Sequence, residues 1–409
     1  MTGSPKQSFS GRRELFGESE PIPSGGCFLP KQALSMSLLQ LPARLRNIAV
    51  FTLALPCATP AHSEDSTSTA AGNGFVGAPF AKYSPETGFA GGVVGLYYFR
   101  LVTDTSADSR PSNVSGGVTY TQKKQISTGI DYDFYFGGGR YHWSGGFDYK
   151  KIPFDFYGVG DRSPKDPVDT YTPLWRGGDF EVTRNFISTA RGEGLNAGVA
   201  GEVRDDRILS SSPGGPLSAG TIPGSRGGLS SGFGFLVMDD TRDNTFSTLS
   251  GAYVKFKAMF YGSATGSSFT FNRYDIDARK FITLGGRHTL AFQAIAELAK
   301  GAEPFYTMAG LGGDVNTRGY FQGRFRDNDM LVLQAEYRVP LYWRFAFAAF
   351  GSAGEVAGST GAFTLGGVKI SAGAGIRFLV VPQERLGVRL DFGQGRDSSE
   401  IYFSILEAF

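Results

Sequence analysis

The chain has little cysteine and no long hydrophobic segment. Its two cysteines, Cys27 and Cys57, both precede the first expected strand, so the folded part has no disulfide and no cysteine ligand for a metal. A membrane-spanning helix needs a run of roughly 18 or more apolar residues, and the sequence contains none. The 40 basic and 38 acidic residues leave a formal net charge of +2. No polybasic surface therefore indicates nucleic-acid binding.

Glycine and aromatic residues are abundant instead. The 409 residues include 58 glycines, and 14% of them are aromatic. This length suffices for one large barrel or for two ordinary domains. The mean hydropathy of -0.14 is that of a soluble protein. In a membrane β-barrel, however, polar residues facing the lumen cancel the apolar residues facing lipid, so a low average does not exclude a barrel.

The C-terminal segment alternates between apolar and polar positions and stops on an aromatic residue. In the stretch Glu400-Ile401-Tyr402-Phe403-Ser404-Ile405, Ile401, Phe403 and Ile405 share one face, and the chain ends at Phe409. This pattern is typical of the closing strand of a transmembrane β-barrel. Because such barrels occupy the bacterial outer membrane, the pattern predicts that location.

The whole chain contains about sixteen candidate strands, an even number, as an antiparallel single-chain barrel requires. We expect them at Val76 to Lys82, Phe89 to Leu101, Asn113 to Gln122, Gln125 to Phe136, Tyr141 to Ile152, Asp179 to Phe186, Asn196 to Val203, Ser231 to Met238, Ala252 to Tyr261, Ser268 to Phe281, His288 to Ala299, Met330 to Pro340, Tyr342 to Ser352, Val368 to Val380, Leu386 to Phe392 and Glu400 to Ala408. The alternatives, a soluble β-sandwich or an extended soluble sheet, are disfavoured because these strands are long. The predicted fold is all-β, a single transmembrane antiparallel β-barrel of about 16 strands.

Alternation also predicts which face of each strand is inside. Between Met330 and Leu341 the odd positions are apolar, among them Leu333, whereas the even positions include Gln334 and Glu336. A register slip of one residue would move the charged set into lipid, so the faces are well determined. The same pattern sets Val254, Phe256, Ala258 and Phe260 against Lys255 and Lys257, and Tyr274, Ile276 and Ala278 against Arg273, Asp275, Asp277 and Arg279.

The N-terminal part divides into two segments before the barrel. Residues 1–35 are polar and aperiodic, as in a disordered leader or an over-extended start. Residues 36–63 combine Arg44 and Arg46 with an apolar run and small residues, which indicates a secretory signal peptide. The alternative for that segment is a short buried helix. The barrel domain is expected at residues 74–409.

Five short segments form an ordered set along the chain. They are Phe156-Tyr157-Gly158-Val159-Gly160; Asp240-Thr241-Arg242-Asp243-Asn244 with Gly251; Gly312-Gly313 with Thr317-Arg318-Gly319-Tyr320; Glu336-Tyr337-Arg338; and Ile401-Tyr402-Phe403-Ser404 to Phe409. As a set they resemble the barrel of the BamA/TamA outer-membrane assembly superfamily, also called bacterial surface antigens, over roughly residues 74–409. The terminal Phe409 also resembles the signal that barrel assembly recognises.

The resemblance implies a non-enzymatic outer-membrane barrel that assists the insertion or translocation of polypeptides, through a weakly zipped seam between its first and last strands. It implies as partners outer-membrane lipid, nascent outer-membrane or secreted polypeptides and a separate periplasmic factor, and no cofactor. Relatives usually carry POTRA domains before the barrel, whereas here only a short stretch separates the expected signal peptide from the first expected strand. The rival hypothesis is a passive structural or pore-forming barrel without the assembly role.

Thr317-Arg318-Gly319-Tyr320 lies in the longest clear interstrand segment of the C-terminal half, Gly301 to Asp329. By resemblance, this segment is an extracellular loop that folds back into the barrel and directs Arg318 toward Glu336. Tyr320 closes the tetrapeptide. The alternative is an ordinary turn, in which Gly319 supplies a positive φ.

The chain departs from the family at one acidic position. Relatives often have a Phe-x-Asp-x-Gly motif on the strand after the glutamate, but this chain has Phe350-Gly351-Ser352-Ala353-Gly354. Ser352 cannot supply a second carboxylate. We therefore expect Arg318 to depend on Glu336 more heavily than in relatives.

Motifs for enzymatic chemistry are few and weak. Gly228-Leu229-Ser230-Ser231-Gly232 matches a hydrolase elbow, but no helix follows it. After removal of a signal peptide only His142 and His288 are sure to remain, and neither has a metal-ligand spacing. The acidic turn around Asp239, Asp240 and Asp243 is better explained as a solvated hairpin end than as a cation site. We expect no catalytic residues and no metal.

The first prediction concerns processing. We expect the mature protein to begin near His62 or Glu64 and to reside in the outer membrane, because a charged segment, an apolar core and small residues precede that point. Intact-mass measurement of the outer-membrane fraction checks this. Retention of residues 1–60, or recovery from the inner membrane, would contradict it.

Overall fold

A computed structural model describes residues 57–59, 74–84, 88–99, 112–189, 192–244, 247–381, 385–405 and 407–409. The expected leader at residues 1–35, and the expected signal peptide at 36–63 apart from 57–59, lie outside the described residues. No helix in the described ranges is long and apolar enough to cross a membrane.

The described part contains twenty strands and three short 3-10 turns. They are β1 (Cys57–Thr59), β2 (Gly74–Ser84), β3 (Gly88–Phe99), β4 (Ser112–Thr121), β5 (Ile126–Phe136), β6 (Tyr141–Lys151), β7 (Phe154–Phe156), β8 (Asp169–Thr189), β9 (Gly192–Ser210), β10 (Gly228–Asp240), β11 (Gly251–Tyr261), η1 (Ser263–Thr265), β12 (Phe271–Thr283), β13 (Thr289–Gly301), β14 (Ala309–Leu311), β15 (Phe325–Asp327), β16 (Asp329–Pro340), β17 (Phe345–Ala357), η2 (Thr360–Ala362), η3 (Leu365–Gly367), β18 (Lys369–Val381), β19 (Leu386–Gln394) and β20 (Ser399–Ile405).

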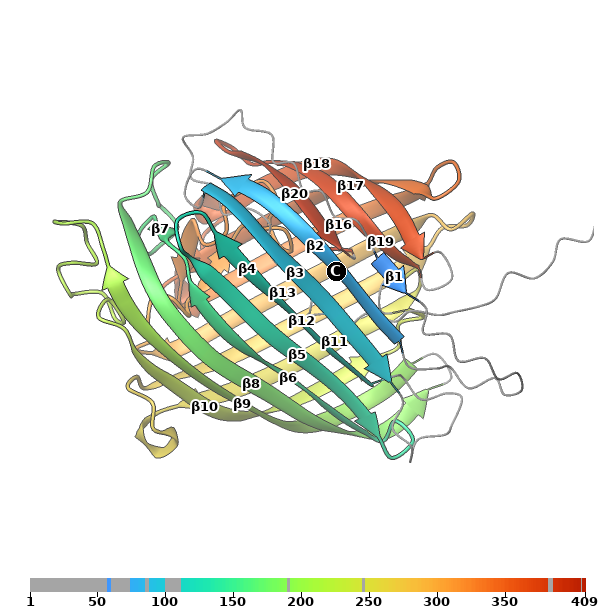
Figure 1. The fold of residues 1–409 in the computed structure, drawn as a ribbon, viewed down its shortest axis with the longest axis horizontal. Helices are drawn as coiled ribbons and strands as arrows, with labels where there is room; N and C mark the ends of the chain where they lie inside the picture. Colours follow the sequence, from blue (N-terminus) through green and yellow to red (C-terminus); the bar gives the residue numbers. More distant parts are fainter. Residues whose placement is uncertain are drawn as a thin grey trace, which may run out of the picture.

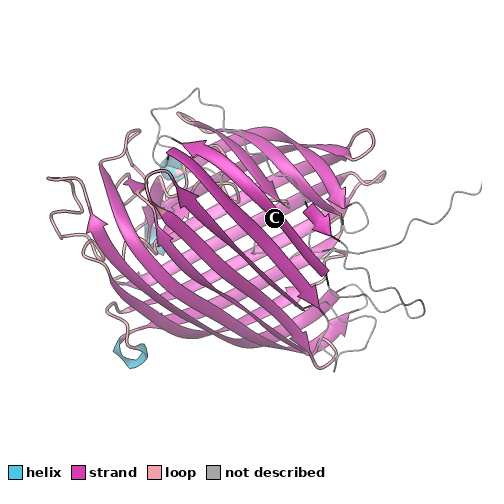
Figure 2. Cartoon of the chain, viewed as in Figure 1, coloured by secondary structure: helices cyan, strands magenta, loops and turns pink. Residues whose placement is uncertain are grey.

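Sixteen of these strands form one antiparallel wall. Each strand from β2 to β6 pairs with the next, β6 pairs with β8, the series continues to β13, and β16 to β20 complete it. The wall curves into a barrel whose strands run obliquely (Figures 1 and 2). The predicted sixteen-stranded all-β barrel is confirmed.

The two ends of the barrel and its seam differ in their connections. Longer segments, 152–168, 211–227 and 302–328, lie between strands at one end, which is the extracellular end in barrels of this kind. At the seam, the pairing registers of the described residues join β20 to β19 and β2 to β3, and do not join β2 to β20. The edge of β2 instead pairs over three residues with β1.

Alternation along β16 places its two faces as the sequence predicts. Leu331 and Leu333 are 41% and 64% exposed on the outside, whereas Gln334 and Glu336 are buried inside. On β11 and β12 the charged residues also turn inward: Lys255 Nζ contacts Glu181 Oε1 at 2.7 Å, and Arg279 Nε contacts Asp277 at 3.0 Å. The outer face is apolar because it meets lipid, and the inner face pairs its own charges.

Several strand boundaries differ from the prediction. β8 and β9 span 21 and 19 residues, because both continue well past their expected ends at the long-loop end of the barrel. β17 starts at Phe345 rather than Tyr342, since Trp343 has a φ of 56° and forms a turn. β20 ends at Ile405 rather than Ala408, and both Ala408 and Phe409 are buried.

The assignment of β6 side chains to the lipid face or the lumen face gives a second prediction. Phe147 is 64% exposed near the middle of the strand, so Phe147→Arg should lower the free energy of unfolding by about 2 to 4 kcal/mol. Ser144 lies in register between Asp133 and Glu181, so Ser144→Arg should cost less than about 1 kcal/mol. Unfolding midpoints in lipid vesicles compare the two variants. Equal losses would show that the faces are wrongly assigned.

Candidate functional site

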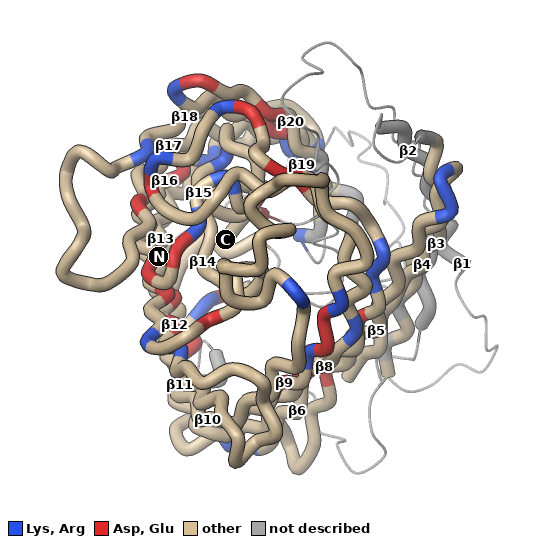
Figure 3. Tube along the Cα trace, turned by 90° about the vertical axis from the view of Figure 1, so that its left-hand side faces the viewer, with Lys and Arg blue, Asp and Glu red and all other residues tan. Residues whose placement is uncertain are grey.

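The segment between β13 and β16, residues 302–328, enters the barrel; we call it the inserted loop. Viewed along the barrel, its β14–β15 hairpin lies inside the ring of strands (Figure 3). The hairpin packs on the inner face of the wall through a hydrophobic cluster. Its members are Ala309, Leu311, Tyr320, Phe325, Met330, Val332 and Val356. The loop therefore has its own buried core, which fixes its position relative to β16 and β17.

Arg318 lies at the deepest contact of the inserted loop with the wall. Its side chain is 1% exposed, with Nη2 at 2.6 Å from Glu336 Oε2 and Nη1 at 2.7 Å from Asp391 Oδ2. The guanidinium carbon also lies 3.5 Å from the centre of the Phe350 ring. Two carboxylates and an aromatic face thus surround one cation, an arrangement suited to the planar, multidentate guanidinium.

Asp391 on β19 supplies the second carboxylate that the sequence prediction missed. Arg318 therefore pairs with Asp391 as well as with Glu336, and its heavier dependence on Glu336 than in relatives stays a prediction. Ser352, at the position where relatives often have an acid, instead shares a hydrogen bond with Ser371 (2.7 Å between the two Oγ atoms). The alternation of residues on β19 could have predicted that Asp391 points inward, because Leu390 and Phe392 are exposed on either side of the buried Asp391.

Further charges complete what we call the Arg318 cluster. Its members are Arg318, Arg338, Arg377 and Arg389 with Asp314, Glu336, Asp391 and Glu407. The cations and the carboxylates are equal in number, so the cluster is formally neutral. Removing water from ions is costly, and a buried cluster persists only when each charge is paired and hydrogen-bonded. Removal of one charge therefore changes the electrostatic energy of the other charges in the cluster.

Gly319 and Tyr320 fasten the inserted loop to the last two strands. Gly319 has a φ of 121°, and a Cβ there would lie 2.7 Å from the carbonyl carbon of Gln394 on β19. Its N–H donates to the Tyr402 hydroxyl on β20 at 2.8 Å, and that hydroxyl donates to the carbonyl of Tyr320 at 3.2 Å. The loop thus contacts β20 as well as β16 and β19.

The segment Phe156-Tyr157-Gly158-Val159-Gly160 holds the inserted loop at its outer side. Phe156 and Tyr157 are buried, with ring centres 5.2 Å from Phe305 and 5.6 Å from Phe321 respectively. The Gly160 N–H donates to the carbonyl of Arg326 at 2.7 Å. This family segment is therefore a packing partner of the loop.

The turn motif before Gly251 lies at the short-turn end of the barrel. Arg242 is 4% exposed, with Nε at 2.7 Å from Asp240 Oδ1. Asp243 accepts hydrogen bonds from two backbone N–H groups of its own turn, and Asn244 accepts one. Asp243 also pairs with Arg385 at 2.6 Å. Because Arg385 belongs to the β18–β19 connection, this ion pair joins two turns that are distant along the wall.

Gly251 begins β11 with a φ of 112°, and a Cβ there would lie 2.2 Å from the Thr241 carbonyl oxygen. At the C-terminal strand, Ile401 is 56% exposed. The side chains of Phe403 and Ile405 lie outside the described residues. Phe409 is buried beside Phe281 and Ala291, and its carbonyl accepts a hydrogen bond from Arg338 Nη2 at 2.8 Å. The chain end therefore turns into the barrel interior.

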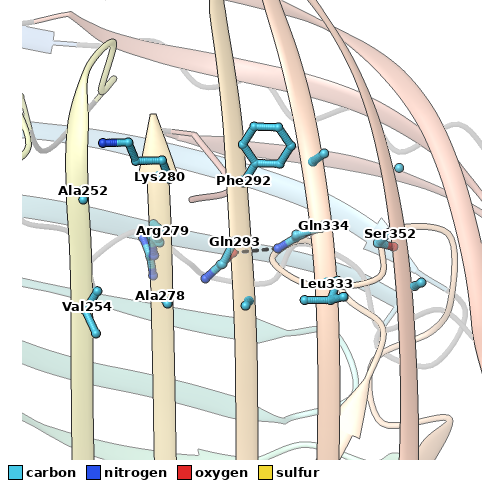
Figure 4. Close-up of a pocket in the computed structure, with 14 residues that line it drawn as sticks. Ala252, Val254, Ala278, Arg279, Lys280, Phe292, Gln293, Leu333, Gln334 and Ser352 are labelled. Atoms are coloured by element: carbon cyan, nitrogen blue, oxygen red, sulfur yellow. Dashed lines mark hydrogen bonds between the residues drawn. The ribbon is translucent and has the colours of Figure 1, made fainter. Parts of the chain in front are cut away.

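A cavity of about 690 Å³ adjoins β11 to β13, β16 and β17. The exposed Val254 and Leu333 contribute to its apolar lining (Figure 4). Gln334 lies alongside, donating to Gln293 Oε1 at 2.7 Å and to the carbonyl of Val315 in the inserted loop at 2.8 Å. Gln334 is therefore another contact between β16 and the loop.

The structure gives no support to enzymatic or metal chemistry at the residues weighed above. Ser230 lies on β10, which leads into β11 and not into a helix. His142 contacts Asp133, and His288 Nδ1 lies 2.7 Å from the Tyr337 hydroxyl. No group of three or more His, Cys, Asp or Glu residues within the described ranges is arranged to hold a metal ion.

A sixteen-stranded barrel with an apolar outer face and a loop fastened inside defines a class of bacterial outer-membrane proteins. The family model for the Omp85 superfamily domain matches residues 110–405. The chain belongs to the Omp85 superfamily. No curated protein matches the sequence significantly.

Solved structures share the fold at low sequence identity. BamA from Haemophilus ducreyi lacking POTRA domains 1-3 has 11% identity and a TM-score of 0.53, covering 86% of this chain and 74% of that one. CdiB from Acinetobacter baumannii has 10% identity and a TM-score of 0.52, covering 87% and 65%. CdiB from Escherichia coli has 13% identity and a TM-score of 0.53, covering 88% and 68%. The similarity at this level concerns the fold.

Arg318 provides the third prediction. Arg318→Ala leaves two buried carboxylates without one of their cations, so it should lower the free energy of unfolding by about 3 to 5 kcal/mol. Glu336→Gln alone should leave the inserted loop protected from protease, because Asp391 still holds Arg318. Double-mutant cycles of Arg318→Ala with Glu336→Gln and with Asp391→Asn measure the coupling.

Arg287→Ala, at an exposed position in the β12–β13 turn, is the control for that experiment. Additive effects in both cycles, with the loop equally protected in every variant, would show that Arg318 does not hold the loop.

Glu303 provides a pH-dependent prediction. Its side chain is 1% exposed at the base of the inserted loop. Burial raises the pKa of this carboxyl from 4.5 to about 7, although the positive charge of Arg273, whose Nε lies 3.7 Å from Glu303 Oε1, lowers the pKa in part. The folded protein then holds a proton that the unfolded chain releases. Stability should therefore be fully present below about pH 4.5 and fall as the pH rises through about 7.

Glu303→Gln should abolish this loss, matching the parent protein in acid and exceeding it above neutral pH by on the order of 1 to 3 kcal/mol. Denaturant unfolding across the pH range checks the expectation. Parallel pH profiles for the parent and the variant would rule it out.

Proposed function

We propose that this barrel assists the insertion or translocation of polypeptides across or into the outer membrane, in the manner of BamA/TamA-type proteins. The single observation that carries the proposal is the set of pairing registers in the described part of the chain, which join β2 to β3 and β1, and β20 to β19, but do not join β2 to β20. An edge strand offers unpaired backbone N–H and C=O groups, and an incoming strand can pair with them. At the seam, an incoming strand that adds to the edge of β2 displaces only the three-residue pairing with β1.

The inserted loop supports this role because it controls one side of the seam. Gly319 and Tyr320 hydrogen-bond Tyr402 on β20, and Arg318 pairs with Asp391 on the adjacent β19. The last two strands are thereby held from inside the barrel. We infer that β20 keeps its shape when its outer edge is unpaired, and so acts as a template for a polypeptide strand.

The first strand is the weaker partner at the seam. β2 begins GFVGAP, and glycine and proline both weaken a strand, since glycine has no side chain to pack and proline lacks an N–H for the ladder. We infer from this composition that exchange of a substrate strand at β2 costs less than exchange at β12, which contains neither glycine nor proline. The proposed chemistry is hydrogen-bond exchange, with no covalent step and no cofactor.

Site-specific photo-cross-linking in cells tests the proposal. A cross-linker at Ile401, which is exposed on β20, should trap nascent outer-membrane or secreted polypeptides or a periplasmic factor, whereas one at Phe147, equally lipid-facing on β6, should trap lipid only. A passive structural or pore-forming barrel would trap no polypeptide at either position. That result, with the protein correctly folded in the outer membrane, would overturn the proposed function.

A further inference from the structure

A second cavity, of about 400 Å³, opens at the long-loop end of the barrel, where four chain segments meet. They are the 152–168 connection, the inserted loop, the start of β18 and the turn between β19 and β20. We call it the outer cavity. Its charged lining residues are Asp161, Arg162, Arg324, Lys369, Arg396 and Asp397. Four cations and two carboxylates give this lining a formal charge of +2, in contrast to the neutral Arg318 cluster deeper inside.

The charges in the outer cavity are incompletely neutralised. Asp397 forms an ion pair with Arg324: Nη1 of Arg324 lies 2.9 Å from Oδ1 of Asp397, and Nη2 lies 2.7 Å from Oδ2. Asp161 lies 4.0 Å from Arg162, whose side chain is 94% exposed. Lys369 and Arg396 form no ion pair within the described ranges, and Lys369 Nζ donates only to the carbonyl of Gly367 at 2.9 Å. Two cations therefore face the cavity without a carboxylate.

Arg324 adds a donor inside the same cavity. The residue is 4% exposed, and its Nε has no hydrogen-bond partner among the described residues. A buried guanidinium donor without a partner costs free energy unless a ligand or water satisfies it. The cavity thus combines Lys369 and Arg396, two cations without a carboxylate partner that are suited to an oxyanion, with the buried guanidinium of Arg324 beside them.

We propose that the outer cavity binds a phosphate-bearing ligand, with Lys369 and Arg396 as its principal contacts. A phosphate monoester carries a charge of roughly -1.5 to -2 at neutral pH and three acceptor oxygens, so it matches the excess charge of the lining. Its tetrahedral oxygens can meet cations from several directions, whereas a planar carboxylate meets one fork. The ligand is the phosphate group of an outer-leaflet lipid or of a soluble phosphorylated molecule.

Binding would fasten the inserted loop from its outer side. Arg324 and Tyr320 belong to that loop, whereas Lys369 and Arg396 belong to β18 and to the β19–β20 turn. The backbone N–H of Arg396 already donates to the Tyr320 hydroxyl at 3.0 Å. A bound phosphate would bridge these segments, so it should protect the loop from protease and raise the unfolding temperature. The inference does not depend on the proposed function.

Calorimetric titration of the purified full barrel in detergent with inorganic pyrophosphate tests the site. We expect saturable binding, weakened about tenfold or more in the Lys369→Gln/Arg396→Gln variant because two charge-assisted contacts are lost. The matched control is Lys280→Gln/Arg287→Gln, which removes one exposed lysine and one exposed arginine at the short-turn end. Heat-induced unfolding of each variant verifies that it is folded.

The source of the phosphate is distinguished in vesicles of phosphatidylcholine with or without phosphatidic acid. Loop protection by phosphatidic acid that is lost in the double variant would identify a lipid headgroup. Protection by pyrophosphate alone would identify a soluble ligand. The absence of saturable pyrophosphate binding, or equal binding by the parent, the double variant and the control, would overturn the proposal.

Discussion

The burial of Arg318 between Glu336 and Asp391 is the interaction on which the arrangement of the lumen depends. A cation with 1% exposure must be paired and hydrogen-bonded to be stable, and its two carboxylate partners come from strands β16 and β19. The inserted loop must therefore remain inside the barrel, and β16 to β19 must keep their mutual register. The position of the loop and the register of these strands therefore depend on each other.

This constraint divides the barrel into two unlike halves. The inserted loop bonds β16, β18, β19 and β20 on one side of the barrel. On the other side it reaches β10 through the Tyr306 hydroxyl and β12 through Glu303. Charges on the opposite wall are paired within that wall, as Asp148 is with Lys150 at 3.3 Å. The seam therefore joins β19 and β20, which the loop holds from inside, to strands such as β6, whose charge pair lies within the wall.

The sequence predicts most of the wall and only part of the site. Alternation works for β16 because Leu333 and Glu336 have opposite preferences for lipid and for a paired interior. The same alternation predicts β8 and β9 to be shorter than they are, because the part of a strand that extends beyond the membrane no longer needs apolar residues on its outer face. Asp391 could be placed inward by the exposed Leu390 and Phe392, but its pairing with Arg318, 73 residues away, depends on how the loop folds. Tyr402 is a similar case, since no local pattern shows that its hydroxyl meets Gly319.

The two halves also determine how the seam can open, if it opens as proposed. Separation on the β20 side would break the Tyr402 hydrogen bonds and strain the ion pair of Asp391 on β19, because both hold the same loop. Movement of β2 and its neighbours leaves these contacts intact. Since a buried ion pair costs far more to break than the three-residue pairing of β1 with the glycine-rich β2, opening should proceed by displacement of β2. The template edge is then β20, and its geometry is set by Arg318 from within the lumen.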